Sequence, residues 1–194
     1  MEEFELTFLN INQQQIENKL QEIGAEKIGE FHYRRTVFDF PGFTLDAQGA
    51  WLRLRDEGDK IILAYKRRLG IRSKTTEVSD DGMEEIEIEV EGFEKTREIL
   101  LRLGLIEKFY QENKRIRWQK DDVTYDIDLW PKIEPYLEIE ASSRDTLLKG
   151  VAVLGLDPKI GRICSNFQIY MDKGIDIREY QRMTFEEFTK RNNT

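Results

Sequence analysis

Charged side chains recur at every second residue in several segments of this sequence, and within each segment they carry charge of one sign. The acidic sets are Glu3 and Glu5; Glu85, Glu87 and Glu89; Asp126 and Asp128; and Glu138 and Glu140. The basic sets are Arg53 and Arg55, and Arg115 and Arg117, with Lys66 on the strand expected to pair with the first set. Since alternate residues of a β-strand share one face, each set should line one face of its strand.

Two interpretations compete for these sets. Taken singly, each set is best explained as the solvated outer face of an antiparallel strand. Taken together the sets are unusual, because exposed faces mix signs and like charges close together repel each other. A bound ligand relieves such repulsion: carboxylates are the oxygen ligands that Mg²⁺ or Mn²⁺ prefers, and arginine side chains match phosphate oxygens. Together the sets favour a site for a metal–polyphosphate complex.

The residues between these charges predict the elements that position them. Apolar residues alternate with the charged ones in the strands and recur at helical spacing elsewhere. We expect strands over residues 3–9, 30–40, 50–56, 60–67, 85–91, 108–119, 123–130 and 136–141. Helices are expected from a cap at Asn12 to Gly24, over 93–103, from Ser142 or Ser143 to Gly155, and near 185–191. This pattern predicts an α+β protein whose strands close into an antiparallel β-barrel of about eight strands, with helices packed outside.

The second half of this pattern repeats the first. A shift of 80 residues places Glu5 on Glu85, Leu20 on Leu100, Gly24 on Gly104 and Arg35 on Arg115. The sequence therefore predicts an internal duplication of a strand–helix–strand unit.

Composition argues against several classes of protein. The chain has 194 residues, a net charge of −8, one cysteine and one histidine. The negative charge disfavours a general nucleic-acid binder, and no apolar run approaches the roughly 18 residues of a membrane helix. A single cysteine fits a reducing compartment, and a single histidine argues against a zinc site or a serine–histidine triad. The acidic N-terminus has the wrong charge for a signal peptide, so the sequence predicts a cytoplasmic protein. It also predicts a single domain.

The charged motifs, taken in order, resemble those of the CYTH superfamily, the triphosphate tunnel metalloenzymes. The matching motifs are Glu3-x-Glu5, Arg53-x-Arg55, Leu63-Ala64-Tyr65-Lys66, Glu85-x-Glu87, Lys114-Arg115-x-Arg117, Asp128 and Glu138-x-Glu140, with Val37-Phe38-Asp39 before the second of them. The superfamily includes class IV adenylyl cyclases, thiamine triphosphatases and inorganic triphosphatases. The resemblance covers residues 2 to about 156.

The resemblance implies an eight-stranded antiparallel tunnel over residues 1–158, with 159–194 as a C-terminal extension packed on the same domain. It assigns phosphate binding to Arg53, Arg55, Lys66, Arg115 and Arg117, and metal binding to Glu3, Glu5, Glu138 and Glu140. It assigns catalytic roles to Asp128 and Glu87, with Asp128 binding metal or orienting a water. One position departs from the family pattern, because Thr7 stands where lysine is expected. Arg34 or Arg35 would supply that charge if its side chain faces inward.

Three functions remain open at this point. Hydrolysis of a triphosphate with Mg²⁺ or Mn²⁺ is preferred, because no adenine pocket can be identified in the sequence; tripolyphosphate, thiamine triphosphate and ATP are the candidate substrates. A class IV adenylyl cyclase would use the same phosphate-binding residues to convert ATP into cyclic AMP and pyrophosphate. A polyphosphate- or nucleotide-binding protein without activity is the third, suggested by Thr7. We expect neither nucleic acid nor a membrane as a partner, and a homodimer is compatible with the sequence.

Overall fold

A computed structural model describes residues 4–68 and 83–191 of the chain. By its internal contacts the chain divides into two compact units. Unit 1 comprises Met1–His32 and Asn113–Glu179, and unit 2 comprises Tyr33–Glu112 and Tyr180–Thr194. Two long strands, β2 (Glu26–Asp39) and β6 (Ile106–Lys120), contribute to both units. The predicted domain boundary at residue 158 stays a prediction.

The strands of the described residues pair in the order β1-β8-β7-β6-β2-β3-β4-β5, and β9 lies parallel to β6. Antiparallel pairing dominates this sheet. The predicted α+β fold with an antiparallel sheet of at least eight strands is therefore confirmed. The path starts at β1 and ends at β5 with no pairing between them in the described residues, so the sheet is not strictly closed.

Unit 1 contains an antiparallel sheet and several helices. Its own strands are β1 (Phe4–Phe8), β7 (Val123–Leu129) and β8 (Tyr136–Ala141). Its helices are α1 (Gln13–Glu22), α4 (Arg144–Val153), α5 (Asn166–Asp172) and the 3₁₀ turns η1 (Pro158–Ile160) and η2 (Ile177–Glu179). The predicted caps of two of these helices are present: the side chain of Asn12 accepts a hydrogen bond from the backbone N–H of Gln15, and that of Ser143 accepts one from Thr146.

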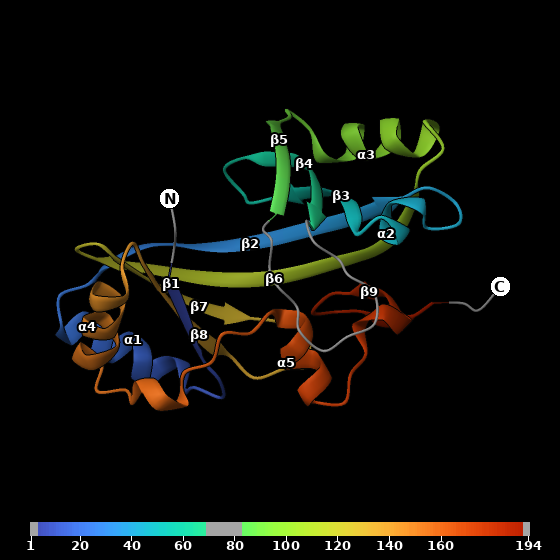
Figure 1. The fold of residues 1–194 in the computed structure, drawn as a ribbon. Coiled ribbons are helices and arrows are strands. Elements are labelled where there is room, and N and C mark those ends of the chain that lie inside the picture. Colours follow the sequence, from blue (N-terminus) through green and yellow to red (C-terminus); the bar gives the residue numbers. More distant parts are fainter. Residues whose placement is uncertain (1–3, 69–82, 192–194) are drawn as a thin grey trace. The chain divides into compact units, whose positions relative to one another are not determined.

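The core of unit 1 lies between the apolar face of this sheet and helices α1 and α4 (Figure 1). Ile127 and Ile139 from the strands, Leu20 from α1 and Val151 from α4 are fully buried. Burying these side chains is the main favourable contribution to folding. Because residues of a strand alternate between faces, this packing turns the charged residues of β1, β6, β7 and β8 to the opposite face.

Helix α4 approaches the sheet closely because it carries a glycine at the contact. A Cβ atom on Gly150 would lie 2.8 Å from a methyl group of Val123, closer than packed carbon atoms allow. The Tyr125 hydroxyl donates a hydrogen bond of 3.3 Å to the Gly150 carbonyl oxygen. This close packing holds α4 against β7.

Unit 2 holds the remaining strands of the sheet and has its own core. Its strands are β3 (Ala50–Asp56), β4 (Ile61–Arg68), β5 (Met83–Glu89), β9 (Tyr180–Met183) and β10 (Phe188–Lys190), and its helices are α2 (Thr44–Ala47) and α3 (Phe93–Arg102). Phe38, Leu54, Phe93 and Leu100 form a core between β2, β3 and α3. The β3–β4 hairpin is present as predicted, with Gly58 at a positive φ of 93° in its turn.

The duplication predicted from the sequence is present in the structure. Strand–helix–strand segments occur at β1-α1-β2 and at β5-α3-β6. The corresponding residues Leu20 and Leu100 are both buried, and Gly24 and Gly104 both end their helices at positive φ. The positive φ explains the glycines, because only glycine adopts this conformation without strain.

The helix predicted near residues 185–191 is wrong. Phe188–Lys190 forms β10 and pairs with β9 across a turn in which the Thr184 backbone N–H donates to the Glu187 carbonyl oxygen at 2.7 Å. The rings of Tyr180 and Phe188 lie 4.5 Å apart across this pair. Cross-strand aromatic packing therefore outweighs the weak local preference for a helix.

Within residues 4–68 and 83–191, no helix combines the length and the apolar character needed to cross a membrane.

Candidate functional site

The first candidate cluster is the polar face of β1 and β8 in unit 1. The antiparallel register places Glu5 directly opposite Glu140, and Thr7 directly opposite Glu138. Directly opposed side chains of neighbouring strands lie within contact distance of each other. Three residues predicted to bind metal, Glu5, Glu138 and Glu140, therefore share one surface. The fourth, Glu3, lies outside the described residues.

The next two strands extend this face with two further acids and two arginines. Asp126 of β7 lies opposite Glu138 of β8. On the other side of β7, Arg115 of β6 lies opposite Asp128, and Arg117 lies opposite Asp126. We call the polar face formed by these strands the acidic face. Its charged residues are Glu5, Arg115, Arg117, Asp126, Asp128, Glu138 and Glu140.

Arg115 is the centre of the acidic face. Its Nε and Nη2 atoms donate to the two oxygens of Asp128 at 2.9 and 2.5 Å. Its Nη1 donates to Asp126 at 2.7 Å, and its Nη2 also donates to Glu138 at 2.7 Å. Burial alone would lower the pKa of Arg115, but the carboxylates of Asp128, Asp126 and Glu138 raise it above its ordinary value. Arg115 therefore stays charged and holds three carboxyl groups together.

The carboxyl groups outnumber the guanidinium groups on this face, and this excess affects the pKa of Glu138. Burial and the neighbouring Asp128 carboxylate raise the pKa of Glu138 to about 8, although Arg115 opposes the shift; Glu5 adds a smaller contribution in the same direction. Like charges brought together away from water disfavour ionisation in this way. A further cation on this face would compensate the excess of negative charge.

We expect the stability of the protein to report this shift. The folded form keeps a proton on Glu138 that the unfolded chain releases near its ordinary pKa of 4.5. Stability should therefore fall as the pH rises from about 4.5 to 8, by at most about 1.4 kcal/mol per pH unit. Glu138→Gln removes this dependence. The stability of the variant relative to the wild type should therefore increase as the pH rises to about 8, and should stay constant above pH 8.

Urea unfolding at intervals between about pH 5 and pH 9 measures this difference. The lost contact with Arg115 adds only an offset that does not vary with pH. Glu26→Gln, at an exposed position, is the control and should show no growing difference. A difference between Glu138→Gln and the wild type that stays constant across this range would contradict the raised pKa.

Thr7 stands where the family has a lysine, and it belongs to the acidic face as alternation predicts. Other residues of the protein cover its side chain. It is fully buried, and its backbone N–H and C=O groups pair with Arg162 at 2.8 and 2.9 Å. The Cys164 thiol lies beside the Thr7 hydroxyl. Burial raises the pKa of this thiol, with Arg162 opposing the shift. Residues of the C-terminal extension thus occupy the place next to position 7.

The second candidate cluster lies in unit 2, on the polar face of β3 and β4. Arg53 is 14% exposed, and its guanidinium group lies 3.5 Å from the Glu87 carboxylate and 3.9 Å from that of Glu85. Lys66 also pairs with Glu85. Burial and the neighbouring Arg55 lower the pKa of Arg53 to about 10. The positive charge of Arg53 is therefore only partly compensated, and a bound anion would stabilise it.

Two further observations on unit 2 support an anion site. The Nε atoms of Arg53 and Arg55 are buried and have no hydrogen-bond partner in the described part of the chain. A buried donor without a partner costs free energy, which a phosphate oxygen would recover. On β5, a hydrogen bond to the Glu85 carboxyl, together with partial burial, raises the pKa of Glu87. Glu87 is thus better able to hold a proton than an ordinary glutamate.

The structure distinguishes Arg34 from Arg35. The Arg34 guanidinium lies over the ring of Phe93 at 4.5 Å and pairs with Asp56 at 2.9 Å, so it belongs to the side of β2 that packs on α3. Arg35 lies directly opposite Arg55 in the β2–β3 pairing and therefore shares its face. We call Arg35, Arg53, Arg55 and Lys66 the basic face.

Two charged residues of these faces were missing from the site predicted by sequence. Asp126 belongs to the same alternating pair as Asp128, and it contacts both Arg115 and Arg117. The sequence predicts Arg35 only as an alternative to Arg34 in supplying the charge of the missing lysine. The repeat of 80 residues, which aligns Arg35 with Arg115, was the feature of the sequence that could have identified Arg35 as a site residue.

The acidic face fits a divalent cation in the chemistry of its groups and in its charge. Its carboxylate oxygens are the ligands that Mg²⁺ and Mn²⁺ prefer, and the raised pKa of Glu138 marks a surplus of negative charge. Among residues 4–68 and 83–191, however, no three His, Cys, Asp or Glu side chains already converge as a metal site. Arg115 instead holds three of the carboxyl groups, those of Asp126, Asp128 and Glu138, through hydrogen bonds.

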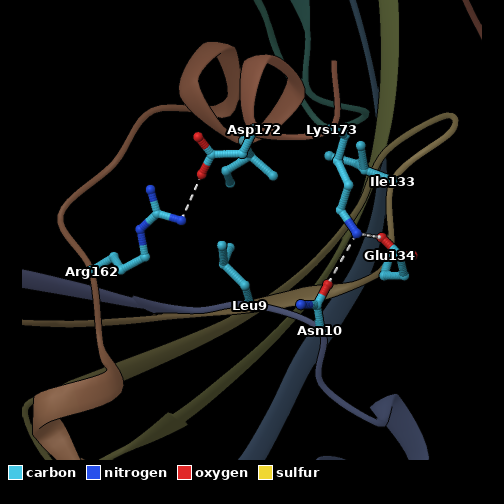
Figure 2. Close-up of a pocket in the computed structure, with 8 residues that line it drawn as sticks. Leu9, Asn10, Ile133, Glu134, Arg162, Asp172 and Lys173 are labelled. Carbon is cyan, nitrogen blue, oxygen red and sulfur yellow. Dashed lines mark hydrogen bonds and ion pairs between the residues drawn. The ribbon is translucent and has the colours of Figure 1, made fainter. Parts of the chain in front are cut away.

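A small cavity of about 150 Å³ in unit 1 lies under helix α5 and is not a candidate site (Figure 2). Arg162 pairs with Asp172 at 2.6 Å, and Lys173 pairs with Glu134 at 2.6 Å. Lys173 also donates a hydrogen bond of 3.4 Å to Asn10. The contact of Lys173 with Asn10 attaches the end of α5 to the end of β1. Because the paired charges around the cavity compensate each other, no charge is left there for a ligand.

The sequence profile of the CYTH domain matches residues 1–160. The chain therefore belongs to the CYTH domain family, as its charged motifs predicted. A search of curated proteins found no match.

Several solved structures share this fold. The PH1012 protein of Pyrococcus horikoshii OT3 is 22% identical, with a TM-score of 0.62 over 86% of this chain and 98% of that one. A provisionally assigned adenylate cyclase of Vibrio parahaemolyticus is 16% identical, with a TM-score of 0.65 over 87% and 97%. HpAC1 of Hippeastrum is 14% identical, with a TM-score of 0.57 over 89% and 96%. At these identities the likeness concerns the fold.

Proposed function

We propose that this protein is a metal-dependent hydrolase of triphosphate compounds. The observation that carries the proposal is the sorting of charge between two polar faces in a chain of the CYTH family. The basic face holds a largely buried arginine, Arg53, whose lowered pKa favours an anion, and the acidic face holds a surplus of carboxyl groups that favours a cation. Hydrolysis of a triphosphate needs both kinds of group. The structure of HpAC1, described as revealing a dominant triphosphatase activity, is consistent with this choice.

The residues take the following roles in the proposal. Arg53, Arg55 and Lys66, joined by Arg35, bind phosphate oxygens through forked or single charged hydrogen bonds. Glu5, Glu138 and Glu140 bind Mg²⁺ or Mn²⁺, and Glu3 belongs to this set by its position in the motif. A bound ion would neutralise charge on the triphosphate and activate the attacking water. These assignments keep the predicted division between phosphate-binding and metal-binding residues.

The other predicted site residues fit the same reaction. Glu87 is proposed to accept a proton from the attacking water, because its raised pKa makes it a better base than an ordinary glutamate. Asp128 orients Arg115 through two hydrogen bonds. Arg115 and Arg117 remain proposed phosphate ligands, since a cation bound by Glu138 would weaken its hold on the Arg115 guanidinium.

Product analysis tests the function directly. The purified protein is incubated with tripolyphosphate, thiamine triphosphate and ATP, each with Mg²⁺, Mn²⁺ or EDTA. Release of phosphate that depends on the metal supports the hydrolase. Cyclic AMP and pyrophosphate from ATP would instead identify a cyclase, and binding without any product would identify a non-catalytic binding protein.

We expect Arg53→Ala to weaken tripolyphosphate binding by about ten- to a hundredfold, the value of one charged hydrogen-bonded contact. Since burial of Arg53 is itself unfavourable, the variant should fold at least as stably as the wild type without ligand. Isothermal titration calorimetry measures the Kd. The control is Arg67→Ala, which removes an exposed arginine of β4 paired with Glu84. Equal affinity of Arg53→Ala and the wild type would contradict the role of the basic face.

A further inference from the structure

A large groove in unit 1 adjoins the proposed metal ligands. It has a volume of about 910 Å³ and lies beside the edge strand β1, next to β8, α4 and η1. Glu5 and Glu140 line it on the side of the acidic face. Ligand-binding clefts for small organic molecules have volumes of about 300–1,000 Å³, so the groove is large enough for such a molecule.

Part of the wall of the groove is apolar and partly exposed to water. Its side chains include Leu6 of β1, Leu147 and Leu148 of α4, and Ile163 of the C-terminal extension. Leu148 is 37% exposed and Ile163 is 79% exposed. Removing this apolar surface from water is favourable, so an apolar or aromatic group would bind against it.

The groove also carries two cations. Arg144 at the start of α4 and Lys159 of η1 line it, and the side chain of neither forms an ion pair within the part of the chain that the structure describes. Two cations next to an apolar wall suit a ligand with an anionic group attached to an apolar body. Glu5 and Glu140 alone would repel such a ligand, whereas a divalent cation bound to them would attract it.

The edge of β1 argues against a peptide strand as the occupant. A bound strand would need the free backbone groups of β1. Those of Thr7 in the middle of β1 are already paired with Arg162. A small ligand that contacts side chains fits the groove better than an added strand.

We propose that this groove binds the organic group of an organic triphosphate, with Arg144 and Lys159 contacting the phosphate next to that group. The inference rests on the proposed function and adds to it the class of substrate. It predicts that an organic triphosphate with an aromatic group, such as ATP or thiamine triphosphate, binds more tightly than tripolyphosphate.

The test replaces two exposed residues of the apolar wall with neutral polar ones, in the double variant Leu148→Gln with Ile163→Gln. Its Kd and KM for ATP or thiamine triphosphate should rise about tenfold, while those for tripolyphosphate stay unchanged. The control is Val153→Gln with Ile160→Gln. Val153 and Ile160 are exposed apolar residues of α4 and η1 that do not line the groove, and replacing them should change neither value.

The outcomes separate this inference from the proposed function. Equal losses for organic and inorganic triphosphates, or no loss for either, would overturn the groove assignment while leaving hydrolysis intact. If the protein hydrolyses no triphosphate, the proposed function fails. The Kd of a non-hydrolysable ATP analogue relative to that of tripolyphosphate then decides the groove. No binding of the analogue, or a ratio that the double variant does not change, overturns it.

Discussion

Arg115→Met should lower the free energy of unfolding by about 3–5 kcal/mol, the usual loss when one partner of a buried ion pair is removed. The Arg115 guanidinium donates hydrogen bonds to Asp126, Asp128 and Glu138, and two of these acids are almost completely buried. Without it, three carboxyl groups remain together in a site with little water. Methionine keeps most of the side-chain volume, so the loss reports charge rather than a cavity.

The control for this variant is Arg117→Met. Arg117 is 35% exposed and donates hydrogen bonds of 2.8 and 2.7 Å to Asp126, so its loss should be clearly smaller. Mg²⁺ or Mn²⁺ should restore part of the stability of Arg115→Met, because a bound cation replaces the missing charge. Urea unfolding with and without metal measures both effects. Equal losses in the two variants would show that Arg115 is not the centre of the acidic face.

The double variant Glu5→Gln with Glu140→Gln should lose metal-dependent turnover by at least about a hundredfold, since even the loss of an outer group around a metal costs ten- to a hundredfold. These two residues lie directly opposite each other on β1 and β8, so their removal takes two charged oxygen ligands from one place. Without metal the variant should be as stable as the wild type or more stable, because like charges no longer oppose each other.

The matched control for this pair is Glu98→Gln with Glu134→Gln, which removes two exposed carboxylates away from the acidic face. Turnover is measured across a titration of Mg²⁺ and Mn²⁺, together with thermal unfolding of the metal-free proteins. Metal-dependent turnover that survives at the wild-type level would contradict the assignment of Glu5 and Glu140. A collapse in stability would instead assign them a structural role.

The duplication explains how one chain provides two polar faces of different charge. In unit 1 the repeated strand places Arg115 opposite Asp128, and in unit 2 it places Arg35 opposite Arg55. The backbone arrangement is the same in both, but the partner strand carries acids in one unit and arginines in the other. Charge on a strand face can change in this way without altering the core, because the apolar residues lie on the other face.

Up to about residue 155, the sequence by itself determined most of the elements and the faces to which their residues belong. Alternation in Glu5, Leu6 and Thr7 is enough to separate a polar face from an apolar one, because the side chains of a strand point alternately to its two sides. The helix starting after Asn12 and the stops at Gly24 and Gly104 also follow from local chemistry. The order of the charged motifs was specific enough to predict the CYTH family.

Only the tertiary structure decided which of these residues meet. Arg115 was predicted to bind phosphate, but the register of the consecutive strands β6, β7 and β8 places it against Asp126, Asp128 and Glu138. Alternation within each strand does not determine that register. The same holds for the pairing of Arg162 with Thr7 and for the groove beside β1. Both involve the C-terminal extension, whose sequence has no clear period and whose position is set by its contacts with other elements.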